Sequence, residues 1–298
     1  MANGETKEAA PDPVSAIRPA TVAWQPLTPR GVAAFANAPF GRLFVVELVV
    51  ALLAAGAVLF FLSHAWFPAI RAAIHALPET GAIRNGELVS PRASSEPLAD
   101  GRALAFAVDT EGAGHAASVA DIRVEFHKTN FQICSLFGCA TFAYPKEWNV
   151  EFSRTERESW WGAWEPNLLW MAAVGVIAFV FVCWTLLATF YFLPVYLLAW
   201  FKDRELTLGG SWRLASAALL PGALLFIAGI FLYALGVIDL LRFLGLAALH
   251  LVVPWVYLIT APLTLPRAAE VAGKKVNPFA AASPDDTAPK PEGGSGTV

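Results

Sequence analysis

Charged residues are scarce in this chain, and their scarcity excludes most soluble folds. The 298-residue sequence is 56% hydrophobic and 15% charged, whereas soluble domains usually carry about 25% charged residues. Its formal net charge is −3, so it also lacks the basic excess with which nucleic-acid-binding proteins neutralise phosphates. The composition therefore predicts an integral membrane protein that contacts the lipid bilayer and binds no nucleic acid.

Sequence motifs of catalysis and cofactor binding are also missing. We find no Ser-His-Asp, H-E-x-x-H, Walker or Rossmann pattern in a suitable context. The stretch GGSW at residues 209–212 comes nearest to a phosphate-binding loop, but it lacks the lysine and the preceding strand. We therefore expect a non-enzymatic protein with no catalytic residue, no cofactor and no metal site.

Long apolar runs, by contrast, are present. A helix needs about 20 apolar residues to cross the hydrocarbon of a bilayer. Four runs qualify as transmembrane helices, at residues 43–66, 167–192, 214–236 and 243–265. The second run continues without a charge to Phe201, which is too long for one span. We expect Pro194 to break it, so that residues 193–213 form a cytoplasmic interfacial segment; a re-entrant piece is the alternative.

The first apolar run is interpreted as a retained signal anchor. A polar segment, residues 1–42, precedes it, and its apolar core exceeds the roughly 7–15 residues of a cleavable signal peptide. Within the polar segment, residues 30–42 are interpreted as a short interfacial helix that leads into the first span.

Basic residues in the short flanks predict the orientation. They gather before the first run, between the second and third, and after the fourth: Arg30, Arg42, Lys202, Arg204, Arg213, Arg267, Lys274 and Lys275. The positive-inside rule places these flanks in the cytoplasm. We therefore expect a bacterial inner-membrane protein with a cytoplasmic N-terminal tail (1–42), a disordered cytoplasmic C-terminal tail (266–298) and an outer turn at 237–242.

In this orientation residues 67–166 form a small extracytoplasmic α+β domain, mostly β, inserted between helices 1 and 2. Asn85-Gly86 lies between short apolar-polar runs and predicts a hairpin. Alternation at residues 104–108 and 122–126 predicts strands, and residues 67–78 predict a short helix. We expect a half-covered sheet near the membrane surface. Four tryptophans, Trp160, Trp161, Trp164 and Trp170, are predicted to form an aromatic belt where the chain re-enters the bilayer.

Two of the three cysteines lie in the extracytoplasmic stretch FQICSLFGCATF. Cys134 and Cys139 flank SLFG, which is typical of a four-residue hairpin loop with Gly138 at a turn position. Because disulfides persist outside the cytoplasm, we favour a structural disulfide between them. A redox-active pair is one alternative, although its usual spacing is C-x₂-C. A metal site with His115 and His127 is the other, although the spacing matches no known ligand set.

Two ionisable residues inside the predicted spans are candidate functional groups, because such groups are costly in lipid. Glu47 lies about one turn inside the first span. We favour a structural carboxylate near the cytoplasmic surface, paired with Arg42 or Arg213, over a proton or substrate relay. His250 lies some two turns inside the fourth span. We favour an imidazole bonded to a carbonyl of a neighbouring helix over a proton-coupling group, and a direct Glu47–His250 pair is not expected.

The order of several segments is similar to that of a bacterial four-span membrane protein family. The first span is followed by AIHALPETGAIRNGELVSP and then LAFAVDTEG, and the third span begins WRLASAALLPGALL. Over roughly residues 40–265 this resembles proteins labelled maltodextrin-utilisation proteins, which are related to the Yip family. The best matches are residues 77–88, the strand that ends in Asp109-Thr110, and the region of Pro221. The resemblance implies the four-span topology and the hairpin, and it carries no catalytic residue across.

Three functional hypotheses follow. The first is a non-enzymatic inner-membrane protein whose extracytoplasmic domain binds or positions a membrane or extracytoplasmic protein partner, as a scaffold, sensor or accessory subunit. The second is a component of a membrane transport system in which Glu47 and His250 take part in coupling. The third is a membrane enzyme that uses the carboxylates of Asp109, Glu111 and Asp121. We favour the first, because the domain shows no reactive constellation.

Overall fold

The structure is a computed structural model that describes residues 25, 27–89, 96–111 and 120–268. The helices are α1 (Pro29–Ala34), η2 (Phe35–Asn37), α2 (Phe40–Phe61), η3 (Leu62–Trp66), α3 (Phe67–Ala76), α4 (Arg154–Phe201), α5 (Leu208–Ala234) and α6 (Leu240–Leu263). The strands are β1 (Ala82–Arg84), β2 (Glu87–Val89), β3 (Glu96–Asp100), β4 (Leu104–Val108), β5 (Ile122–Phe126), β6 (Asn130–Ser135), β7 (Gly138–Ala143) and β8 (Asn149–Glu151).

Four helices in the described part of the chain are long and apolar enough to cross a bilayer. They are the continuous helix Phe40–Ala76, which joins α2, η3 and α3, and the helices α4, α5 and α6. The strands follow the first of them and precede the other three. This confirms the predicted architecture of four apolar helices with a strand-rich insertion, which we call the strand domain (residues 77–153).

The first two long helices extend well beyond the predicted spans. The helix Phe40–Ala76 has 37 residues and α4 has 48, so they are about 56 and 72 Å long. The additional turns pack against each other. The Phe67 and Trp161 rings lie 5.0 Å apart, Arg71 pairs with Glu165, and His75 Nδ1 lies 2.7 Å from Glu158 Oε1. The charged residues of these pairs interrupt the apolar runs, so the sequence predicted shorter helices than the structure has. We call α3 and residues 154–166 of α4 the stalk.

Pro194 does not break the second helix, contrary to the prediction. α4 continues through Pro166 and Pro194 to Phe201, and α5 begins at Leu208. The expected interfacial segment, residues 193–213, is therefore the last turns of α4, a short loop and the first turns of α5. A proline inside a long apolar helix is tolerated when neighbouring helices, side chains or small helix adjustments compensate for the freed carbonyl.

The segment before the first long helix packs against the bundle. Thr28 caps α1 by accepting a hydrogen bond from the Gly31 amide at 3.0 Å. Val32 and Phe35 are fully buried in the helical core. The Arg213 guanidinium donates to the Ala36 carbonyl at 2.6 Å. The predicted cytoplasmic tail of residues 1–42 thus includes a packed piece, because small and apolar side chains fit it beneath α5 and α6.

The strand domain contains two sheets, with strand orders β2-β1-β8 and β3-β4-β5-β6-β7. β1 and β2 form the predicted hairpin, with Asn85 at φ 52° and Gly86 at φ 81°. These left-handed values are those of a type I′ turn. Strands β4 and β5 are parallel, and the other neighbours in this sheet are antiparallel. A core that includes Ala73, Leu77 and Leu98 joins α3 to the strands, so one part of the sheet is covered, as expected.

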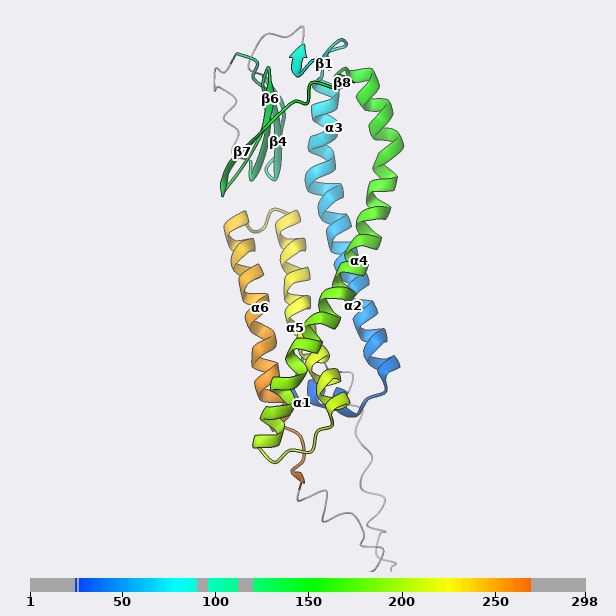
Figure 1. Cartoon of the computed structure of the whole chain (residues 1–298), viewed down its shortest axis with the longest axis vertical. Helices are drawn as coiled ribbons and strands as arrows, with labels where there is room; N and C mark the ends of the chain where they lie inside the picture. Colours follow the sequence, from blue (N-terminus) through cyan, green and yellow to red (C-terminus); the bar gives the residue numbers. More distant parts are fainter. Residues whose placement is uncertain (1–24, 26, 90–95, 112–119, 269–298) are drawn as a thin grey trace, which may run out of the picture.

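The strand domain lies beyond one end of the shorter helices. Figure 1 shows the strands above the upper ends of α5 and α6 and beside the upper parts of α3 and α4. We call this the domain end of the bundle. α1 and the loop between α4 and α5 lie at the opposite end. The stalk therefore holds the strand domain directly over the end of the α5–α6 pair.

Candidate functional site

The strand domain is joined to the bundle through Arg102, in the turn between β3 and β4. Its Nη1 donates to the Ile238 carbonyl at 2.9 Å, and its Nη2 donates to the Tyr233 carbonyl. These carbonyls belong to the C-terminal end of α5 and the loop after it, where helix carbonyls lack intrahelical partners. Gly236 ends this helix with φ 77° and lies against the guanidinium. Arg102 thus supplies the positive charge that a helix C-terminus favours.

A second contact reinforces this junction. The Tyr233 hydroxyl donates to Asp121 Oδ2 at 2.6 Å, and the Arg102 guanidinium lies 5.3 Å from the centre of the Tyr233 ring. The Asp121 amide donates to the Arg102 carbonyl at 2.9 Å. We call Arg102, Asp121 and Tyr233 the junction network. It fixes the lower edge of the larger sheet to α5.

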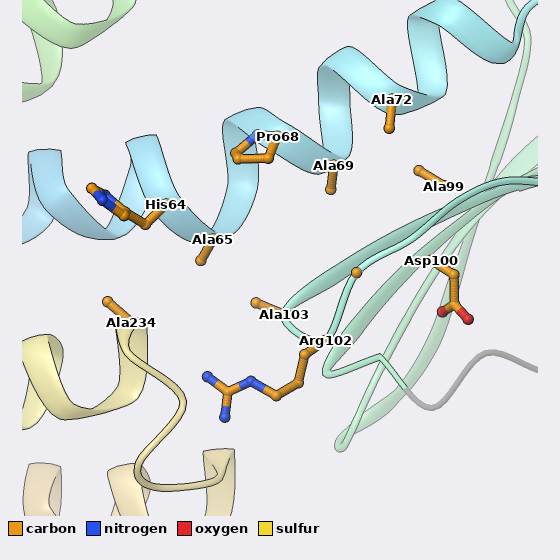
Figure 2. Close-up of a pocket in the computed structure, with 11 residues that line it drawn as sticks. His64, Ala65, Pro68, Ala69, Ala72, Ala99, Asp100, Arg102, Ala103 and Ala234 are labelled. Carbon is orange, nitrogen blue, oxygen red and sulfur yellow. The ribbon is translucent and has the colours of Figure 1, made fainter.

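A cavity of about 340 Å³ lies beside the junction network. Figure 2 shows that α3, the β3–β4 turn and the end of α5 surround it, and that Arg102 points toward the α5 side. Its other lining side chains from α3 and the turn are mostly alanine and proline, with His64 at one end. Asp100 points away from α3 in this view. Because the guanidinium already donates to two carbonyls, the cavity presents space but no convergent catalytic groups.

The three carboxylates considered for catalysis do not form a cluster. Asp121 precedes β5 and Asp109 follows β4, and these strands are parallel and in register from Leu104↔Ile122 to Val108↔Phe126. The two aspartates therefore lie at opposite ends of the strands, about 20 Å apart along the strand direction at 3.3 Å per residue. Glu111 follows Asp109 in the chain. Proximity in the chain does not bring Asp109 and Asp121 together, because the two parallel strands place them at opposite ends of the sheet.

The end of the sheet away from the bundle holds a small polar network instead. His127 Nδ1 lies 2.9 Å from the Asp109 carbonyl oxygen, and the Tyr144 hydroxyl donates to the His127 carbonyl at 3.2 Å. Burial raises the pKa of the Tyr144 hydroxyl, so it stays neutral at physiological pH. The other ring nitrogen of His127, Nε2, lies 3.7 Å from Glu125 Oε2, and Glu125 also pairs with Arg123 at 2.9 Å. These contacts connect the ends of β4, β5 and β7 within one sheet, which is the pattern of a structural network.

Cys134 and Cys139 face each other across β6 and β7, as predicted. Their sulfur atoms are 2.07 Å apart, at disulfide distance, and their Cα atoms are 4.0 Å apart. The loop differs from the prediction: Ser135 pairs with Gly138, so Leu136 and Phe137 alone form it, and Gly138 has φ 115°. Strand pairing therefore extends one residue pair beyond the cysteines.

The metal interpretation of the cysteines does not fit this geometry. Cys134 pairs with Arg123 near the start of β5, whereas His127 follows the end of that strand. His115 lies outside the described residues. Within the ranges that the structure describes, no group of three or more His, Cys, Asp or Glu side chains is placed to hold a metal ion.

Glu47 is buried in α2 and accepts a hydrogen bond from the Ser216 hydroxyl of α5. The Ser216 carbonyl in turn accepts from Trp184 Nε1 of α4 at 2.9 Å. Three helices therefore meet at one polar point inside the bundle. Arg213, one of the two cations expected beside Glu47, donates to the Ala36 carbonyl. The Glu47 carboxylate therefore lies inside the bundle, against α5.

His250 lies in α6, and its Nδ1 contacts the Ala247 carbonyl of the same helix. The prediction of a carbonyl from a neighbouring helix is wrong, since an i−3 carbonyl is within reach of a ring on its own helix. The imidazole stacks on Phe226 of α5, with ring centres 4.6 Å apart. The structure does not bring Glu47 and His250 together: each has its own partners on different elements.

His250 lines an apolar cavity of about 580 Å³ between the four long helices. Its walls come from all of them and combine small and branched side chains with aromatic rings: Ala54, Val58, Phe179, Trp184, Tyr191, Phe226, Ile230, Pro254 and Trp255. A cavity with this lining suits an acyl chain or another apolar group. A single imidazole in such a wall does not make a chain of polar groups across the bundle.

Strand β7 is a candidate binding element that the sequence did not reveal. It is the last strand of the larger sheet, and all six of its residues are exposed. The other edge strand, β3, packs against α3. The sequence predicted the strand but not its place, because no local signal tells an edge strand from an inner one. Arg102 was missed for a similar reason: its partners are more than 130 residues away.

No protein-family model, no curated protein and no solved structure matches this chain. The resemblance to the four-span family therefore stays a prediction.

Proposed function

We propose that this chain is a non-enzymatic integral inner-membrane protein whose extracytoplasmic domain binds and positions a protein partner, as a scaffold, sensor or accessory subunit. The observation that carries the proposal is the free edge of β7, which pairs with β6 and with no other described strand. Two separate connections attach the domain that bears this edge to the bundle. One connection is the stalk, and the other is the junction network of Arg102, Asp121 and Tyr233.

The bilayer placement rests on composition and on charge distribution. The four long helices have large apolar exposed faces, above all α4 and α6. Six basic residues lie at the end of the bundle opposite the strand domain: Arg30, Arg42, Lys202, Arg204, Arg213 and Arg267. By the positive-inside rule this end is cytoplasmic. The strand domain, with its cysteine pair, then lies in the compartment where disulfides persist.

The β7 edge offers backbone hydrogen-bonding groups to an extended segment. Residue pairs in an antiparallel ladder alternate between hydrogen-bonded pairs, with Cα atoms about 5.5 Å apart, and non-hydrogen-bonded pairs at about 4.5 Å. The 4.0 Å between the Cα atoms of Cys134 and Cys139 identifies the second kind. The backbone groups of Cys139, and by alternation those of Thr141, therefore point away from β6. Such an edge accepts an added strand from a partner.

Site-specific photocrosslinking in cells at normal expression tests this proposal. A photoreactive amino acid at Thr141 should give a defined protein adduct, whereas one at Glu87, exposed on β2 of the other sheet, should not. Absence of an adduct at Thr141, or identical adducts at both positions, would contradict a docking role for β7.

A transport role is the second candidate, favoured by the apolar cavity at His250. In this hypothesis Glu47 and His250 take part in coupling. Glu47→Gln and His250→Ala would then each abolish a transport phenotype at normal protein levels. Normal transport in both variants would remove this candidate.

A further inference from the structure

The tip of the β6–β7 hairpin lies at the membrane-facing edge of the strand domain. Ser135, at the end of β6, pairs with Ile122, at the start of β5. The residue before Ile122 is Asp121, which accepts the hydroxyl hydrogen bond of Tyr233 in the last turn of α5. Leu136 and Phe137 continue past Ser135 in the same direction. The tip is therefore level with the end of α5. Strand β7 lies two strands from β5, which is about 10 Å at 4.8 Å per strand.

The side chains at this tip are apolar and exposed. Phe137 is 84% exposed and Leu136 is 60% exposed. Phe137 is more exposed than any of the large apolar side chains on the four long helices. Two residues at the ends of the α5–α6 turn, Val237 and Leu241, are also largely exposed. Apolar side chains from the hairpin and from this turn thus stand at one level around the domain end of the bundle.

A bilayer around the helices would reach this level. α6 has 24 residues, or about 36 Å of helix, whereas a bilayer measures about 40–45 Å with its headgroups. The headgroup region therefore extends past the end of α6 to the level of the hairpin tip. Aromatic side chains are favoured at this depth. In water, by contrast, the exposed Phe137 and Leu136 side chains would gain no burial of apolar surface. Figure 1 shows that the lower end of the sheet faces the ends of α5 and α6.

We propose that Leu136 and Phe137 insert into the outer-leaflet interface of the bilayer. The tip of the β6–β7 hairpin, which we call the foot, then holds the strand domain against the membrane surface. The cysteine pair holds the two strands together directly behind the tip. Strand β7 then stands upright on the membrane, with its free edge presented sideways. This inference rests on the proposed bilayer placement of the four helices, and it does not depend on whether β7 binds a protein.

Photocrosslinking to lipid in nanodiscs tests the insertion. The full chain is reconstituted in phosphatidylcholine nanodiscs with a benzophenone amino acid at position 137, and covalent lipid adducts are measured by mass spectrometry. Val89 is the matched negative control, because it is 60% exposed and lies on β2 at the far end of the stalk. Phe190 is the positive control, because it is 75% exposed on α4 within the bundle.

We expect lipid adducts at positions 137 and 190 and at least a severalfold lower yield at 89. Adducts at 190 but not at 137 would overturn the foot and leave the bilayer placement standing. An adduct between position 137 and a second copy of the chain, in place of lipid, would also overturn it. Absence of lipid adducts at 190 would contradict the bilayer placement itself, and with it the foot.

Discussion

At the scale of single residues, Arg102 connects two parts of the molecule that are far apart in the sequence. It is an exposed arginine in a tight turn, and the sequence around it resembles many other turns. Its guanidinium nevertheless holds the Tyr233 and Ile238 carbonyls and lies over the Tyr233 ring. Together with the Tyr233–Asp121 hydrogen bond, this side chain joins the end of α5 to the larger sheet above the bundle.

Replacement of this arginine should loosen the end of α5. We expect Arg102→Ala to cost about 1 kcal/mol, the typical worth of hydrogen bonds at a partly exposed site. Hydrogen exchange of the Gly236 and Val237 amides, which close the last turn of α5, should become severalfold faster in detergent. Arg242→Ala is the control, since Arg242 makes an exposed pair with Asp239 three residues away. Equal exchange in both variants would argue against the junction network.

The cysteine pair supports a second prediction at this scale. In the mature protein neither Cys134 nor Cys139 should react with maleimide until a reductant is added. Replacement of both by serine should lower the stability of the strand domain by about 2 kcal/mol, the chain-entropy value for so short a loop. Labelling of both thiols before reduction would show that the pair is not a disulfide in the cell.

At the scale of elements, the sequence predicted the features that depend on neighbouring residues and missed those that depend on contacts between distant residues. The four apolar helices follow from run length, and the β1–β2 hairpin follows from Asn85-Gly86, because both signals lie within a few residues. The stalk was missed because its polar pairs, such as Arg71 with Glu165, are remote in sequence. Pro194 was misread because the predicted break depends on the cost of a freed carbonyl, which packing between helices can lower.

The contact of α5 with α6 offers a sharp test at this scale. Pro254 has no N–H to bond the His250 carbonyl, and this carbonyl faces Gly222 of α5. A Cβ at Gly222 would lie 2.6 Å from the His250 oxygen and 3.0 Å from the Pro254 ring. Gly222→Ala should therefore cost about 1–3 kcal/mol by overpacking and lower the melting temperature in detergent.

Gly245 on α6 provides the matched control for this contact. A Cβ there would meet no atom within 4 Å, so Gly245→Ala should be neutral or slightly stabilising, because alanine favours the helix. A loss of stability in Gly245→Ala as large as in Gly222→Ala would contradict the close approach of the two helices.

At the scale of the whole molecule, the proposed arrangement is a platform that carries the strand domain. In the proposed arrangement the bundle crosses the bilayer, the stalk and the junction network fix the strand domain over α5 and α6, and the domain presents the edge of β7. The candidate sites of the sequence, Glu47 and His250, lie within the bundle and have separate partners there. The features that would meet another protein lie in the strand domain, where only the three-dimensional arrangement of the strands reveals them.

The orientation of this platform is directly testable. A reporter that is active only outside the cytoplasm, fused after Val298, should be inactive, because both chain ends are expected on the cytoplasmic side. The same reporter inserted in the loop between β7 and β8, at Glu147, should be active. The opposite pair of results would invert the topology and place the cysteine pair in the cytoplasm.

The most direct test of the central claim is a comparison of copurifying proteins in mild detergent, from cells at normal expression. The wild-type chain should carry a stoichiometric protein partner. Thr141→Pro should lose the partner, because proline removes the backbone N–H that points outward from the free edge of β7. Thr141→Val keeps this N–H and should retain the partner. A chain that purifies alone, or a partner that Thr141→Pro retains in full, would contradict the account.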